Sequence, residues 1–90
     1  MQVDTRWGQA IRSAFGNQVR ALRKKQSISQ EELALKCELD RSYIGQVERG
    51  ERNISLENIY RIAVGLRVPA RELLTEIEGT LDLSSWGITQ

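Results

Sequence analysis

Four polar side chains in one short segment have the chemistry needed to bond to the edges of DNA bases. Arginine can donate two hydrogen bonds to guanine, glutamine can pair with adenine, and tyrosine can touch the methyl group of thymine. On a helical wheel of about 100° per residue, two of the four side chains point away from Ile44 and Val47, and the other two flank the boundary; Gly45, on the polar side, suits close approach. A solvated helix face carries similar residues, so the interpretation depends on the elements that position the four side chains. They are Arg41, Ser42, Tyr43 and Gln46.

The segment before these residues predicts a helix with a double start signal. Ser29 and Glu32 have the spacing of a capping box, and Ile28 with Leu33 fits the hydrophobic staple around it. The apolar face of this helix then continues to Cys37, the single cysteine of the chain, which we expect to be a buried packing thiol. A redox role for the same thiol is the alternative.

A second helix is expected to follow almost at once. Asp40 is a good N-cap, and Leu39 with Ile44 repeats the staple. Since only about three residues remain between the two helices, the helices must cross rather than align. Two crossed helices with a polar outer face on the second form the layout of a helix-turn-helix DNA reader.

Apolar stripes predict further helices on both sides of this unit. The leading helix ends near Gln26 and begins as early as Thr5, with Gly16 as a possible break. Ser55 can cap a helix whose core stripe starts at Leu56. Val68–Pro69 starts a fifth helix. The predicted fold is all-α, a compact five-helix bundle with a central helix-turn-helix.

Three stretches of the chain resemble the XRE class of regulators, the Cro and phage-repressor type. They are VRALRKKQSISQEELA, LDRSYIGQVERGERNISLENIYRIAVGL and VPARELL. The resemblance covers residues 13–78 and implies a lambda-repressor-like DNA-binding domain. Residues 1–12 would be an N-terminal extension that continues the first helix, and 79–90 a C-terminal tail.

Within this class, LDRSYIGQVERGERNISL is most similar to the controller proteins of restriction-modification systems. Those are small homodimers that bind operators near their own gene and the endonuclease gene. The resemblance therefore implies a sequence-specific transcriptional regulator that binds double-stranded DNA as a homodimer, on a palindromic operator.

The resemblance also implies roles for individual residues. Arg41, Ser42, Tyr43 and Gln46 occupy its base-reading positions. Arg23 and Glu48 occupy the positions of a structural ion pair that ties the leading helix to the recognition helix. Gln30 looks like the family glutamine that bonds a phosphate and braces that helix. The residues expected near the DNA backbone are Ser29, Gln30, Arg49, Arg52, Asn53 and Arg20.

Two positions depart from the family pattern. Glu38 stands in the turn where the family usually has glycine, and a left-handed conformation costs a residue with a Cβ about 1 kcal/mol. Gly45 stands where the family usually has a small polar residue, which removes one possible DNA contact.

The C-terminal part of the domain is more apolar than one short helix needs. The resemblance places a two-fold contact here, and the expected interface residues are Tyr60, Val64, Leu73, Leu74 and Ile77. In the tail, Leu81, Leu83 and Trp86 could extend this interface, dock on the same subunit or bind another molecule.

Composition narrows the function class. The net charge is only +1, but residues 1–53 hold ten Lys/Arg against seven Asp/Glu, so basic charge gathers around the helix-turn-helix. No segment approaches the roughly 20 apolar residues of a membrane span, and the N-terminus lacks a signal-peptide core. We therefore expect a cytoplasmic protein with no metal, no cofactor and no evident small-molecule ligand.

Three rival functions come from other classes. An antitoxin would combine the same DNA-binding head with a toxin-binding tail over 79–90. A pure interaction module would have lost DNA binding, which the polar helix face argues against. An enzyme is disfavoured because the chain has no histidine and no phosphate loop, and because Glu31 and Glu32 face apart on a helix.

Overall fold

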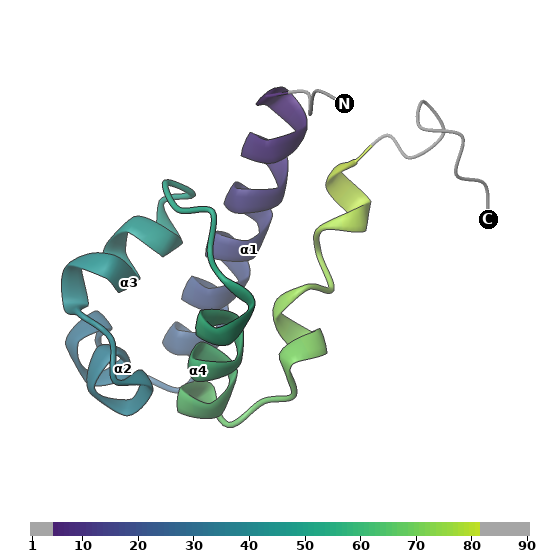
Figure 1. Ribbon diagram of the computed structural model, residues 1–90. Coiled ribbons are helices and arrows are strands. Elements are labelled where there is room, and N and C mark those ends of the chain that lie inside the picture. Colours follow the sequence, from purple (N-terminus) through teal and green to yellow (C-terminus); the bar gives the residue numbers. More distant parts are fainter. Residues whose placement is uncertain (1–4, 82–90) are drawn as a thin grey trace.

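The longest described element is helix α1, Thr5–Lys25, which runs through the middle of the view in Figure 1 with other elements on both sides. The computed structural model describes residues 5–81. Within this range there are four α-helices, two short 3-10 helices and no strand, which confirms the predicted all-α fold. After α1 the elements are α2 (Gln30–Cys37), α3 (Arg41–Glu48), α4 (Leu56–Leu66), η1 (Ala70–Leu73) and η2 (Glu78–Thr80).

Helix α1 runs without interruption through Gly16, so the extended helix is confirmed and the alternative, a break at Gly16, is not. A Cβ at Gly16 would lie 2.2 Å from the backbone oxygen of Val47 and 2.8 Å from that of Glu48. Glycine stands at this position because the C-terminal end of α3 packs directly against the α1 backbone. The start of α1 at Thr5 agrees with the early start predicted from the sequence.

The helix starts follow the capping signals, with one exception. The Ser29 hydroxyl accepts a hydrogen bond from the backbone N–H of Glu32 at 3.0 Å, and the backbone N–H of Ser29 donates to the Glu32 carboxylate at 2.9 Å. These bonds lower the pKa of Glu32 below its ordinary value. Ser55 caps α4 through the N–H of Asn58 at 3.2 Å. Asp40 occupies the N-cap of α3, but its side chain makes no capping hydrogen bond.

The turn between α2 and α3 holds Glu38 in a left-handed conformation, with φ 57° and ψ 44°. Its backbone N–H points back at the carbonyls of Ala34 and Leu35, which closes the end of α2. The turn therefore has the left-handed conformation that suits glycine, in a residue that carries a Cβ.

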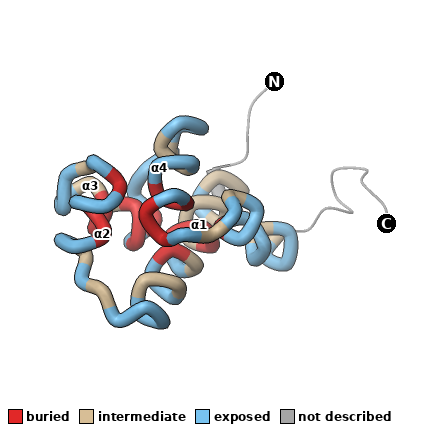
Figure 2. Tube along the Cα trace, turned by 90° about the horizontal axis from the view of Figure 1, so that it is seen from below, coloured by how far each residue is buried: buried red, intermediate tan, exposed pale blue. Residues whose placement is uncertain are grey.

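Buried residues gather where the four α-helices meet, as the red segments of the tube show (Figure 2). Cys37 lies in this core, and burial raises the pKa of its thiol to about 11. A Cβ at Gly65 would lie 2.5 Å from the Cys37 sulfur, so α4 approaches α2 closely at this point. The core side chains are Phe15, Val19, Leu33, Ala34, Cys37, Ile44, Val47, Ile62, Ala63, Leu66 and Leu73.

The predicted fifth helix is present only as the 3-10 helix η1, which lies beside α1 and α4. The side-chain amide of Gln18 donates to the Glu72 carbonyl at 2.9 Å, and the Thr75 hydroxyl donates to the same carbonyl at 3.3 Å. The carbonyl that would continue an α-helix is thus satisfied by other partners, and the chain turns instead. The tail residues Leu83 and Trp86 lie outside the described residues.

None of the described helices combines the length and the hydrophobicity that crossing a membrane requires.

Candidate nucleic-acid interface

Helix α3 presents the polar face predicted from the sequence. Ile44 and Val47 are almost fully buried, whereas Arg41 and Ser42 are exposed at the N-terminal end of the helix. The other two predicted base-reading residues are partly buried, because the loop after α3 folds back along them. They are Tyr43 and Gln46.

Arg52, in the loop after α3, holds both of these side chains. Its Nε donates to the Gln46 side-chain oxygen at 2.7 Å, and its guanidinium carbon lies 5.2 Å from the centre of the Tyr43 ring. Because a guanidinium only donates, the Gln46 amide must turn its oxygen toward Arg52 and leave its NH₂ group available. The amide thus retains the donor, and one acceptor lone pair, that adenine recognition requires.

Tyr43 has a second tie that sequence analysis missed. The side-chain amide of Asn58, on α4, donates to the Tyr43 hydroxyl at 3.1 Å. No local pattern could reveal this contact, because the two residues lie 15 positions apart on different helices. The Tyr43 ring is therefore positioned by α4 as well as by α3.

A buried ion pair fixes α3 relative to the helices that precede it. Arg23 donates to the Glu48 carboxylate through Nε at 2.6 Å and through Nη2 at 2.9 Å, and its Nη1 donates to the Ile28 carbonyl at 3.0 Å. The pair implied by the resemblance is thus present, in bidentate form. The hydrogen bonds to Glu48 raise the pKa of Arg23 above its ordinary value.

Gln30, at the start of α2, completes this brace. Its side-chain amide donates to the Glu48 carboxylate at 3.1 Å, which leaves its second N–H available. Helices α1, α2 and α3 therefore meet at one carboxylate. A Cβ at Gly45 would lie 3.2 Å from Arg49 Nη1 and 3.6 Å from the Gln30 oxygen, so these two side chains share the space over Gly45.

The residues expected near the DNA backbone do not all gather in one place. The structure brings Gln30 and Arg49 together over Gly45, and Arg52 and Asn53 lie exposed in the loop that follows α3. Arg49 forms an exposed salt bridge with Glu51, at 2.8 Å from Nε to the carboxylate, which sequence analysis missed. Ser29 caps α2 directly before Gln30, and Arg20 lies exposed on another element, α1.

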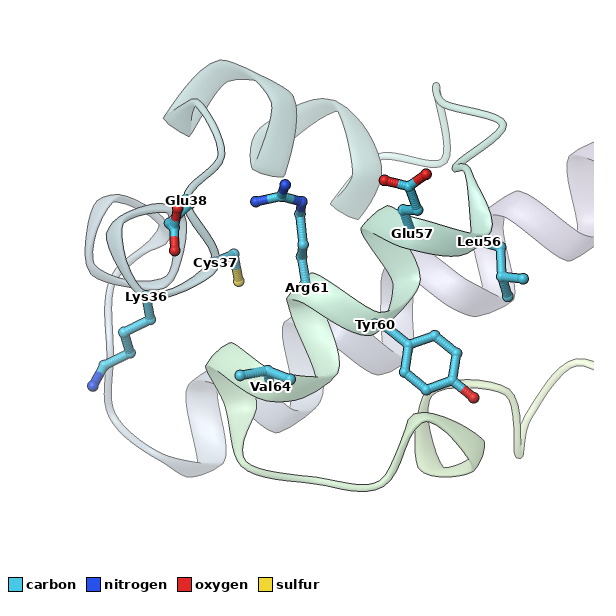
Figure 3. A pocket seen from close by; sticks show the side chains of 8 residues that line it. All are labelled: Lys36, Cys37, Glu38, Leu56, Glu57, Tyr60, Arg61 and Val64. Carbon is cyan, nitrogen blue, oxygen red and sulfur yellow. The ribbon is translucent and has the colours of Figure 1, made fainter.

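The expected dimer residues divide between the surface and the core. Tyr60 and Val64 are 57% and 72% exposed on α4, beside a hollow of about 540 Å³ between α4 and the end of α2 (Figure 3). Leu74 is 39% exposed. Leu73 is fully buried against α4 and α1, so its assignment to an interface was wrong. Ile77 is partly buried against the same core.

Leu56 corrects a second expectation. It was placed at the start of the core stripe of α4, but its side chain is 71% exposed on the same side as Tyr60 (Figure 3). The rest of the expected stripe of α4 does face the core, so only Leu56, at the first turn of the helix, joins the exposed apolar surface.

The described residues contain no group of three or more histidine, cysteine, aspartate or glutamate side chains placed to hold a metal ion.

A model of the helix-turn-helix family matches residues 19–73, which include all of α2, α3 and α4. The chain belongs to the XRE-type helix-turn-helix family. It is a DNA-binding transcriptional regulator and not an enzyme. Its fold is the lambda-repressor-like fold implied by the resemblance.

Two proteins similar to this helix-turn-helix chain are control proteins. Control protein C.BamHI of Bacillus amyloliquefaciens is 49% identical over 65 residues, which cover 71% of this chain and 80% of that protein. Control protein C.MunI of Mycoplasma sp. is 44% identical over 69 residues, which cover 76% of this chain and 93% of that protein.

Comparison with solved structures supports the same fold. The restriction-modification controller protein C.AhdI of Aeromonas hydrophila superposes with a TM-score of 0.67 at 51% identity, covering 68% of this chain and 92% of that one. The hypothetical transcription factor NHTF from Neisseria superposes with a TM-score of 0.70 at 43% identity, covering 74% and 77% of the two chains.

Proposed function

We propose that this regulator is a restriction-modification controller protein that acts as a homodimer on a palindromic operator. The observation that carries the proposal is a recognition helix held by a buried carboxylate, with Arg41 and Ser42 exposed at its leading end. Similarity to control proteins over about three quarters of the chain supports the controller role. A regulator of this kind acts where the chromosome is, so the proposed location is the cytoplasm.

In the proposed complex, each subunit inserts the leading end of α3 into the major groove. Base edges would be contacted by Arg41, Ser42, Tyr43 and Gln46. Phosphates would be contacted by Ser29, Gln30, Arg49, Arg52, Asn53 and Arg20. Residues 13–78 form the proposed DNA-binding domain. Two-fold symmetry then requires half-sites about one helical turn, or 10 base pairs, apart. Bound protein would block polymerase or recruit it, according to where the operator lies.

The apolar surface of α4 supports the dimer. Leu56, Tyr60 and Val64 form a continuous exposed side of the helix, and Leu74 adds to the exposed apolar area. Exposed apolar surface of this kind is typical of contact sites between proteins. Since Leu73 belongs to the core, Leu73→Asp would test folding and not pairing.

The dimer is tested by Val64→Asp, which places a charge on the exposed side of α4 and leaves the core intact. Size-exclusion chromatography with light scattering should show a dimer for the wild type and a monomer for the variant. Arg71→Gln, also at an exposed position, is the control and should remain dimeric. A dimeric Val64→Asp would show that pairing uses another surface.

The DNA-binding mode is tested by selecting bound duplexes from a random pool. The selected sites should contain two inverted half-sites, and Arg41→Ala should lose preference at one or two base positions while keeping non-specific affinity. A selected site without two-fold symmetry would contradict the palindromic operator. Uniform weakening on all sequences would instead assign Arg41 to a phosphate.

A further inference from the structure

A polar hollow of about 390 Å³ lies between the N-terminal half of α1 and the loop after α3. It is separate from the base-reading face and from the apolar surface of α4. The matched family segment begins at residue 19, so the part of α1 that lines the hollow precedes it. The lining residues are Gln9, Arg12, Arg49, Gly50, Glu51 and Asn53.

Arg12 is held in a defined position at the wall of this hollow. Its Nε donates to the Gly50 carbonyl at 3.3 Å, and its Nη2 donates to the Gln9 side-chain oxygen at 3.2 Å. The guanidinium folds back along α1 over Gly8, where a Cβ would lie 3.1 Å from Nη1. A guanidinium has five N–H donors, so these two bonds leave donors for a further acceptor.

Arg49 faces the same hollow and already binds an anion, the carboxylate of Glu51. The two groups pair in bidentate form, with Nε to Oε2 at 2.8 Å and Nη2 to Oε1 at 3.3 Å. A phosphate accepts the same forked pair of hydrogen bonds. Because the two side chains are 59% and 52% exposed, water and other anions can reach the pair, and the pair is exchangeable.

We propose that this hollow binds one phosphate of the DNA backbone, which replaces the Glu51 carboxylate on Arg49 and gains Arg12 as a second cation. The site rests on the proposed DNA-binding function and extends it to a residue of α1. Asn53 can add a neutral donor from the loop. Since Arg49 also lies beside Gln30 over Gly45, the phosphate contacts form one edge that runs from α2 to α1.

Glu51 then acts as a placeholder that weakens binding to any duplex. A phosphate must displace the carboxylate from Arg49 before it can use the site, and it meets the negative charge of Glu51 while it does so. Both effects oppose binding equally on every sequence, because backbone phosphates carry no sequence information.

The test is the salt dependence of duplex binding by the full-length protein. Fluorescence anisotropy would follow binding to a random-sequence duplex of about three helical turns, between about 50 and 200 mM salt. Each phosphate neutralised contributes about 0.9 to the slope of log affinity against log salt. Arg12→Gln should lower the slope by about 0.9, and Arg12→Lys should restore it, because lysine keeps the charge. Glu51→Gln should tighten binding several-fold.

Matched controls separate the site from a general change of charge. Arg71→Gln and Glu76→Gln make the same charge changes at exposed positions outside the hollow, and should leave slope and affinity unchanged. If Arg12→Gln weakens binding but keeps the wild-type slope, Arg12 acts only by holding Gly50, and the phosphate site is overturned. Affinity of Glu51→Gln equal to that of the wild type would overturn the placeholder role. Absence of duplex binding by the wild type would overturn the proposed function itself.

Discussion

Two arginine–glutamate pairs flank the C-terminal end of α3, and they differ in almost everything except their chemistry. The Arg23–Glu48 pair, at 2.6 Å, has side chains only 11% and 3% exposed, whereas the Arg49–Glu51 pair, at 2.8 Å, has side chains 59% and 52% exposed. The buried pair has few water molecules with which to exchange, and the exposed pair is surrounded by them. The same contact therefore serves as a fixed joint in one place and as an exchangeable one in the other.

The two pairs also differ in what they connect. Arg23 and Glu48 lie 25 positions apart, and the pair joins α1 to α3 while Gln30 adds α2. Arg49 and Glu51 are only two positions apart and join no two helices. Because the Arg23–Glu48 pair is buried and joins separate helices, it fixes the position of the recognition helix α3. The Arg49–Glu51 pair is exposed and local, so it affects only the charge beside that helix.

The largest effect is expected from breaking the buried pair. Glu48→Ala leaves the Arg23 guanidinium without its partner in a nearly closed site, which should lower the free energy of unfolding by about 3–5 kcal/mol. Urea denaturation followed by circular dichroism would measure it. A double variant, Arg23→Met with Glu48→Met, should recover much of the loss because it strands no charge. If Glu48→Ala lowers the free energy of unfolding only by the amount typical for surface ion pairs, the two pairs do not differ in the way described.

Gly16→Ala tests whether the packing of α3 on α1, beside the Arg23–Glu48 pair, depends on close approach of the two helices. The new Cβ would meet the Val47 and Glu48 carbonyls, so the helices must separate, at an expected cost of about 1–3 kcal/mol. Gly8→Ala, on the same helix, meets only the movable end of Arg12 and is the control. Because alanine favours helix over glycine by about 1 kcal/mol, Gly8→Ala should be neutral or stabilising. Equal effects at both positions would contradict the packing role of Gly16.

An effect of intermediate size is expected at the turn before α3, where the strain lies in the backbone of Glu38 and not in an ion pair. Glu38→Gly should raise the free energy of unfolding by about 1 kcal/mol, because glycine adopts the left-handed conformation without a Cβ clash. Thermal unfolding would show it as a higher Tm. Lys36→Gly, within α2, should have the opposite sign. A destabilising Glu38→Gly would show that the side chain makes a contribution larger than the strain.

The smallest effect on stability is expected for the exposed pair and should appear as a pH dependence of the free energy of unfolding. Hydrogen bonding from Arg49 lowers the pKa of Glu51 below its ordinary value of 4.5 in the folded protein. The stability that this carboxylate contributes is therefore present above pH 4.5 and is lost as the pH falls through the lowered value. In urea titrations from about pH 7 to pH 3, Glu51→Gln should lack this small component while it matches the wild type in acid. If the stabilities of Glu51→Gln and the wild type instead diverge as the pH falls, the pKa of Glu51 is not lowered by folding.

Local signals predicted the starts of the helices, because a capping box lies within four successive residues. Ser29 with Glu32 and Ser55 with Asn58 form the expected cap bonds. The prediction of a full fifth α-helix was wrong, because the Glu72 carbonyl accepts a hydrogen bond from Gln18, 54 positions away. A hydrogen bond across that separation leaves no pattern in either segment.

The candidate site divides in the same way. The polar face of α3 followed from a helix wheel, since periodicity alone places Ile44 and Val47 inside. The ties that orient this face did not, because Arg52 and Asn58 belong to the next loop and helix. Leu73 was misplaced for a related reason, since an apolar residue in a short helix suits a partner surface or the core equally well.

Cys37, which lies against Gly65, can serve as a natural reporter of unfolding. Cys37 is 3% exposed, its sulfur lies against Gly65 of α4, and its pKa of about 11 keeps it as the unreactive thiol at neutral pH. An alkylating probe should therefore react slowly with Cys37 in the folded protein and faster once α2 and α4 separate. The rate of labelling at Cys37 would then measure how often the bundle opens, free or bound to a duplex, without any label being engineered into the molecule.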